Sequence, residues 1–101
     1  MIQVKVIKEK RKYRKITILG HAMYDDFGKD IVCSSVSSIV ITTVNAIERI
    51  CKGSISYEEK PFYIKIEKEN DITEKLIQNM ISLLKELEQS YPKNIRFLEE
   101  E

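Results

Sequence analysis

The sequence predicts an α+β fold, a two-layer sandwich in which two helices cover one face of a mostly antiparallel sheet. Four short segments alternate apolar and polar residues with the period of a half-buried strand. Two longer segments repeat apolar residues at helical spacing, and one of them follows each pair of strands. The expected order is therefore ββαββα in a single domain over residues 1–101.

The first two strands are expected at the N-terminus, joined by a charged turn. Their inward positions are Ile2, Val4 and Val6 in the first strand, and Ile16 and Ile18 in the second, which spans residues 13–19. The second strand leads directly into Gly20 and His21. We therefore expect the sheet to anchor this histidine.

The first helix is expected over about residues 31–51, ending at Lys52-Gly53, because glycine commonly follows a helix end. It contains many β-branched residues, which lower intrinsic helix propensity, so burial against the sheet must stabilise it. Ile41 lies off the main apolar stripe. This position indicates a second contact face, for example with another subunit.

The second half of the chain repeats the pattern. Strands are expected at residues 54–59 and 62–66, with Pro61 in the turn between them. A second helix opens near Asp71 and Glu74, which have capping-box spacing, and ends at Pro92. Residues 94–98 form either a short C-terminal edge strand or a dimer contact.

The composition excludes several classes of protein. Charged residues make up 33% of the chain but the net charge is only +1, so bulk attraction to nucleic acid is not expected. Basic residues cluster near the N-terminus, which we interpret as a solvated hairpin, and direct RNA binding is not expected. We expect no segment long enough to span a membrane, no secretory leader and no disulfide between Cys33 and Cys51, which indicates a cytoplasmic protein. Neither a metal site nor a cofactor is expected.

The only histidine and one of the two cysteines lie in one short motif. An imidazole or a helix N-terminus can lower the pKa of a cysteine thiol, and the thiolate is the nucleophilic form. We expect Asp30 to cap the first helix, which would place Cys33 in its first turn. Unpaired backbone N–H groups there could hold the oxyanion of an acyl-transfer transition state. The motif predicts a Cys33/His21 catalytic pair; the alternative is a buried cysteine and a structural histidine.

The motif resembles that of the bacterial ribosomal-processing cysteine protease family, Prp. The residues that carry the resemblance are Gly20-His21-Ala22 and, at the mouth of the helix, Gly28, Asp30, Cys33 and Ser37. The resemblance covers essentially the whole chain. It implies that Cys33 is the nucleophile and His21 the catalytic histidine, while Asp30 and Ser37 fall on the family's characteristic Asp and Ser. It also implies a cytoplasmic homodimer that removes a short N-terminal extension from a large-subunit ribosomal protein.

This chain departs from the family pattern in two places. Ser34 and Ser35 follow the cysteine where the family tends to have small residues, and the loop over residues 22–30 carries bulky and acidic side chains. The loop residues that we consider candidates for substrate binding are Gly20, Ala22, Tyr24, Asp25, Asp26, Phe27 and Gly28. Asp25 and Asp26 suit a basic peptide.

Two further questions stay open at this level. Asp30 caps the helix, orients His21 as the third member of a triad, or does neither, and the cap is the role we expect; Ser34 and Ser37 are supporting candidates. The rival function is a non-catalytic, ribosome-associated binding module that uses the basic N-terminal hairpin.

Overall fold

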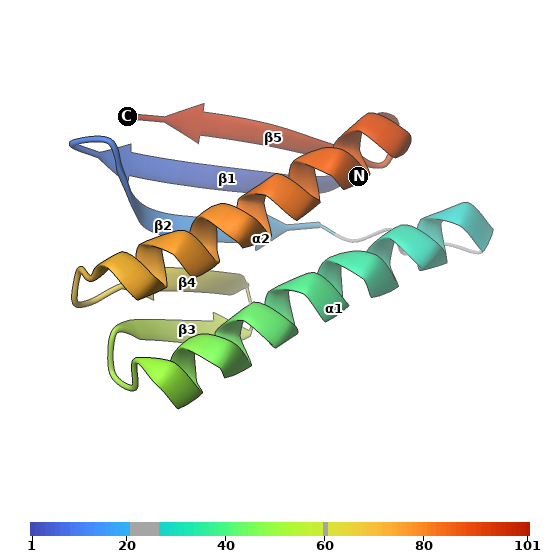
Figure 1. The fold of residues 1–101 in the computed structure, drawn as a ribbon. Coiled ribbons are helices and arrows are strands. Elements are labelled where there is room, and N and C mark those ends of the chain that lie inside the picture. Colours follow the sequence, from blue (N-terminus) through green and yellow to red (C-terminus); the bar gives the residue numbers. More distant parts are fainter. Residues whose placement is uncertain (21–26, 60) are drawn as a thin grey trace.

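The computed structural model describes residues 1–20, 27–59 and 61–101, with side chains described for all of these except 27–30. Figure 1 shows the order of elements along the chain. They are β1 (Ile2–Glu9), β2 (Lys12–Leu19), α1 (Phe27–Ile50), β3 (Ile55–Glu59), β4 (Phe62–Ile66), α2 (Asp71–Ser90) and β5 (Ile95–Glu100). The α+β class and the element order agree with the sequence prediction.

The strands form one sheet in the order β3-β4-β2-β1-β5. β2 pairs antiparallel with β1 and β4, and β3 pairs antiparallel with β4. The C-terminal segment is an edge strand: β5 pairs with β1, with Ile95 beside Ile2, and this pair is parallel. The sheet is thus mostly antiparallel, as predicted.

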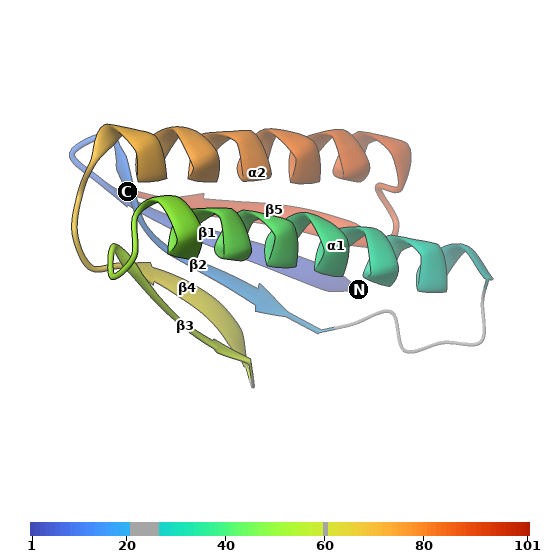
Figure 2. The ribbon, with the colours of Figure 1, turned by 60° about the horizontal axis from the view of Figure 1, so that its bottom comes forward.

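Both helices lie on the same face of the sheet, and Figure 2 shows the resulting two layers. The core lies between the layers. Its fully buried members include Val4, Val6, Ile16 and Ile64 from the strands, and Val32, Ile47, Ile77, Met80 and Leu84 from the helices. The inward-facing residues of the strands and the apolar faces of α1 and α2 therefore pack together in one apolar layer.

The start of α1 differs from the sequence prediction. The helix begins at Phe27, so Asp30 is its fourth residue and not the residue that precedes its first turn. The expectation that Asp30 caps this helix is therefore wrong. Among the α1 side chains that the structure describes, Val32 is the first that is buried, whereas hydrogen bonding along the backbone can begin a turn earlier.

The cap of α2 also lies one residue earlier than expected. Asn70 is extended, and its side-chain oxygen accepts a hydrogen bond from the Thr73 backbone N–H at 2.8 Å. Asp71 is the first helical residue and not half of a capping box. The Asn70 oxygen also accepts a weak bond from the Cys51 thiol at 3.4 Å, which links the start of α2 to the segment after α1.

Within the described residues, α1 is long and apolar enough over Ile31–Ile50 to cross a membrane by length and composition. The expectation that no segment has sufficient length is therefore wrong. Val32, Val36, Val40, Val44 and Ile47 of this helix are buried in the core. Burial in the core therefore accounts for part of the apolar composition of this helix.

The cap predicts a specific loss of stability. Asn70→Ala removes the acceptor for the Thr73 N–H and should lower the free energy of unfolding by about 1 kcal/mol. For a domain of this size that corresponds to a fall in Tm of about 4–8 °C, measured by thermal denaturation. Asn70→Asp keeps an acceptor oxygen and should melt close to the parent protein. Equal melting of all three proteins would show that the cap contributes nothing.

Candidate functional site

The strand β2 ends directly before the predicted catalytic histidine. Gly20 follows Leu19 with a φ of +73°, in the left-handed region that favours glycine. A Cβ at this position would lie 2.5 Å from the Met1 carbonyl oxygen. The chain therefore leaves the sheet through a position that only glycine fills without strain.

Several predicted site residues lie outside the described residues. These are His21, Ala22, Tyr24, Asp25 and Asp26. Their predicted roles stay predictions. Phe27, Gly28 and Asp30 belong to the start of α1, and only their place in its backbone is described.

Cys33 is the seventh residue of α1, which begins at Phe27. Its side chain is half-buried and packs against the core cluster. The first four backbone N–H groups of a helix lack intrahelical partners, and Cys33 lies beyond them. The expectation that Cys33 sits in the first turn, among the unpaired N–H groups that could hold an oxyanion, is therefore wrong. The helix dipole also acts mainly within the first turn, so Cys33 lies beyond its strongest effect.

The two supporting serines are exposed on α1. Ser37 follows Cys33 by four residues and shares its helix face, whereas Ser34 is rotated by about 100° at 3.6 residues per turn. The structure thus brings Ser37 to the side of Cys33 and turns Ser34 away from it.

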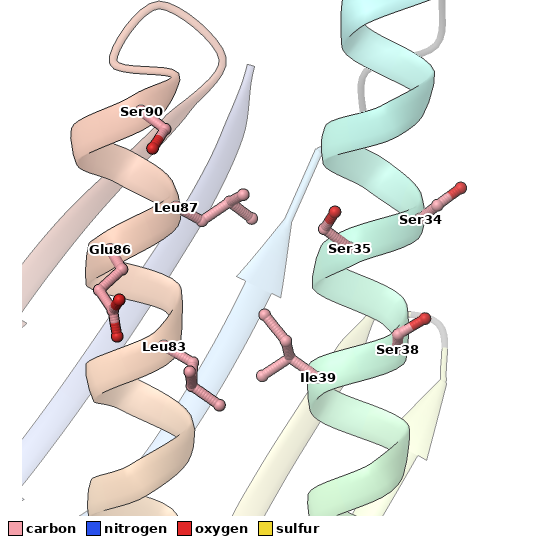
Figure 3. Close-up of a pocket in the computed structure, with 8 residues that line it drawn as sticks. All are labelled: Ser34, Ser35, Ser38, Ile39, Leu83, Glu86, Leu87 and Ser90. Atoms are coloured by element: carbon pink, nitrogen blue, oxygen red, sulfur yellow. The ribbon is translucent and has the colours of Figure 1, made fainter.

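Two surface grooves flank α1. The larger, about 520 Å³, lies between α1 and α2, and Figure 3 shows Ile39 and Leu83 pointing towards each other across it. Its α1 residues are Ser34, Ser35, Ser38 and Ile39. All four are rotated from Cys33 by about 100° or more, so this groove opens on another side of the helix.

The smaller groove, about 350 Å³, lies between α1 and the ends of three strands. We call it the strand-end groove; it is lined by Ile18, Val36, Ser37, Val40, Ile41, Glu59 and Phe62. Its α1 residues follow Cys33 by three, four, seven and eight positions, which is the spacing of a single helix face. The strand-end groove therefore continues the face of α1 that carries Cys33.

On the strand side, this groove is lined by three residues that lie next to one another on neighbouring strands. Phe62 pairs with Ile18 on one side and with Glu59 on the other. Sequence analysis did not identify Ile18, Glu59 or Phe62 as site residues. Alternating hydrophobicity indicated the strands, but no local signal gives the register that aligns these three residues.

Comparison with known proteins identifies the family. A family model described as "Cysteine protease Prp" matches residues 1–96. The ribosomal processing cysteine protease Prp of Staphylococcus aureus is 30% identical, with 95% of this chain and 96% of the relative aligned. The Mycoplasma pneumoniae protein of the same name is 34% identical, over 91% of this chain and 93% of the relative.

Solved structures support the same relationship. The S. aureus Prp in complex with a substrate peptide matches with a TM-score of 0.85 and 28% identity, covering 99% of this chain and all of that chain. The same protease with a covalently linked product peptide matches with a TM-score of 0.83 and 29% identity, over 99% of this chain and all of that one. The two-layer fold described above is therefore the fold of these proteases.

The position of Gly20, where the chain leaves β2, yields a prediction with a matched control. Gly20→Ala places a Cβ in the left-handed region, at a cost of about 1–2 kcal/mol, and also against the Met1 carbonyl. Gly53→Ala meets the same conformational cost at a φ of +86° but has open space for its Cβ. We expect a larger fall in Tm for Gly20→Ala than for Gly53→Ala.

The single histidine offers a second measurement of the same change. Because the sequence contains one histidine, its imidazole NMR signals are unambiguous. Gly20→Ala should shift the His21 signals, while Gly53→Ala should leave them in place. Equal melting and unchanged His21 signals in both variants would contradict the proposed constraint at Gly20.

Proposed function

The chain belongs to the family of the cysteine protease Prp and is a cysteine protease, and we propose that it removes a short N-terminal extension from a bacterial large-subunit ribosomal protein. The proposal is carried by one observation. A half-buried cysteine lies on the helix face that continues into the strand-end groove, in a fold shared with a protease solved with a substrate peptide. The relatives' common name, ribosomal processing cysteine protease, supports a ribosomal protein as the substrate.

In the proposed reaction Cys33 is the nucleophile and His21 the general base. The Cys33 sulfur attacks the scissile carbonyl carbon as His21 takes the thiol proton. His21 then returns the proton to the leaving amine, the C–N bond breaks, and a thioester joins the substrate acyl group to Cys33. Water, deprotonated by His21, hydrolyses the thioester and regenerates the thiol.

The position of Cys33 in α1 changes how its thiolate is best stabilised. Because Cys33 lies in the second turn, the helix N-terminus contributes less than a first-turn position would. The imidazole of His21 therefore carries more of the activation. The helix start excludes the capping role of Asp30, and of the two alternatives that the sequence left open, orienting His21 or neither role, we propose that Asp30 orients His21.

The basic N-terminal hairpin fits a protease better than an RNA-binding module. Glu69 forms ion pairs with Lys12 at 3.9 Å and with Arg14 at 3.4 Å. Arg14 also pairs with Glu9 at 3.7 Å. Carboxylates thus offset part of the positive charge that phosphate contacts would require.

We further propose that the enzyme is a cytoplasmic homodimer. The resemblance to the family implies both properties, and a domain of this size gains stability from association. Two further observations support a dimer: α1 has no charged residue between Asp30 and Glu48, and its Ile41 and Ile50 side chains are 55% and 60% exposed.

The catalytic proposal predicts that substitutions of the two cysteines have different effects on cleavage. Cys33→Ser should abolish cleavage because a hydroxyl is a far weaker nucleophile than a thiolate, while Cys51→Ser should keep turnover. The assay incubates each protein with unprocessed ribosomal proteins and sequences any new N-terminus. Cleavage by Cys33→Ser at the parental rate would refute the assignment of the nucleophile.

The same cleavage assay distinguishes the role of His21 from that of Asp30. His21→Ala should be nearly inactive near pH 7 and recover partly at higher pH, where solvent ionises the thiol. Asp30→Asn keeps the side-chain size but removes the carboxylate, so a large loss of rate with an unchanged Tm is expected if Asp30 orients His21. Full activity of Asp30→Asn would exclude that role.

The dimer proposal is tested by sedimentation over a wide range of protein concentration, with cleavage measured on the same samples. We expect a dimer at micromolar concentration, and activity that falls if dilution dissociates it. A monomer that retains full activity at every concentration would refute the proposal.

A further inference from the structure

We propose that the strand-end groove is a specificity site for the substrate peptide, binding one apolar side chain and one cationic side chain within about four residues of the scissile bond. This inference rests on the proposed protease function. It adds the chemical class of the substrate side chains and assigns Glu59 as the residue that selects the cation.

The distance along α1 between Cys33 and the groove residues determines how far the groove lies from the scissile bond. Ser37 is one turn from Cys33, about 6 Å along the helix axis, and Ile41 is about 12 Å away. An extended peptide advances about 3.3 Å per residue, so three to four residues span that distance. A peptide whose carbonyl lies at Cys33 therefore reaches the groove with its nearest side chains.

The walls of the groove select an apolar side chain. Val36 and Val40 form its base on α1, only 5% and 3% exposed, while Ile18 and Phe62 are half-buried on the strand side. Ile41 is 55% exposed at the rim. Covering these surfaces with an apolar side chain removes them from water, which favours binding.

Among the described residues that line the groove, Glu59 is the one charged group, and it selects a cation. Glu59 is the last residue of β3, is exposed, and pairs across the sheet with Phe62. Among the residues that the structure describes, no ion pair to Glu59 is found. A basic substrate side chain beside the apolar one would supply the missing partner.

The α1–α2 groove provides the internal comparison. It also combines apolar side chains with one carboxylate, that of Glu86, but it opens on a side of α1 that faces away from Cys33. A peptide bound in that groove does not lie along the face of α1 that carries Cys33. Glu86 is thus a matched control for Glu59.

The test measures binding separately from turnover. Fluorescein-labelled decapeptides of glycine and serine carry one Leu followed two positions later by Lys, by Glu or by Ser, and are titrated into the Cys33→Ser protein. We expect the Leu/Lys peptide to bind about two- to fivefold more tightly than the Leu/Ser peptide, a difference that shrinks at high salt. Glu59→Lys should reverse the preference towards the Leu/Glu peptide, and Glu86→Lys should not.

NMR of the Cys33→Ser protein, isotopically labelled, locates the bound peptide. Shifts confined to Ile18, Val40 and Phe62 support the inference, and shifts at Ile39 and Leu83 overturn it. A preference unaffected by Glu59→Lys overturns the assignment of Glu59, and absence of binding by every peptide overturns the groove as a specificity site. If the Cys33→Ser protein binds the peptide in the groove but the parent protein cleaves no ribosomal protein, the proposed function is refuted and the peptide site remains.

Discussion

Contact between the apolar face of α1 and the sheet is the interaction on which the rest of this structure depends. The helix is rich in β-branched residues, which are weak helix formers, and an isolated helix of this composition would be marginal in water. Burial of Val32, Val36, Val40, Val44 and Ile47 against the strands stabilises it instead. Because Cys33 packs against the same core, this contact also positions the cysteine that we propose as the nucleophile.

The sheet supplies the other half of the site through the end of β2. Gly20 combines a positive φ with close approach to the Met1 carbonyl, so the backbone leaves the strand along one path. Ile18, two residues earlier, contributes to the strand-end groove. One strand end therefore both leads into the histidine and forms part of the surface beside the cysteine.

The second hairpin extends this surface. β4 pairs with β2, and β3 lies at the edge of the sheet, so Phe62 and Glu59 continue the row that starts at Ile18. Glu59 is exposed at an edge of the sheet, since β3 is the last strand on that side among the residues that the structure describes. The proposed recognition of substrate thus combines residues from the first half of the chain, which also carries Cys33 and His21, with Glu59 and Phe62 of the second hairpin, and pairing within one sheet joins them.

The sequence by itself determined the fold class, the order of elements and the cysteine–histidine motif, because alternation, helical periodicity and short motifs are local signals. It misplaced the start of α1 and the cap of α2, since Asp30 and Asp71 are acceptable caps by type while backbone hydrogen bonding selects the actual helix ends. It could not show the parallel pairing of β5 with β1, or the row of Ile18, Phe62 and Glu59. Those features depend on strand register, which is set by packing between residues far apart in the chain, and only the tertiary structure decides it.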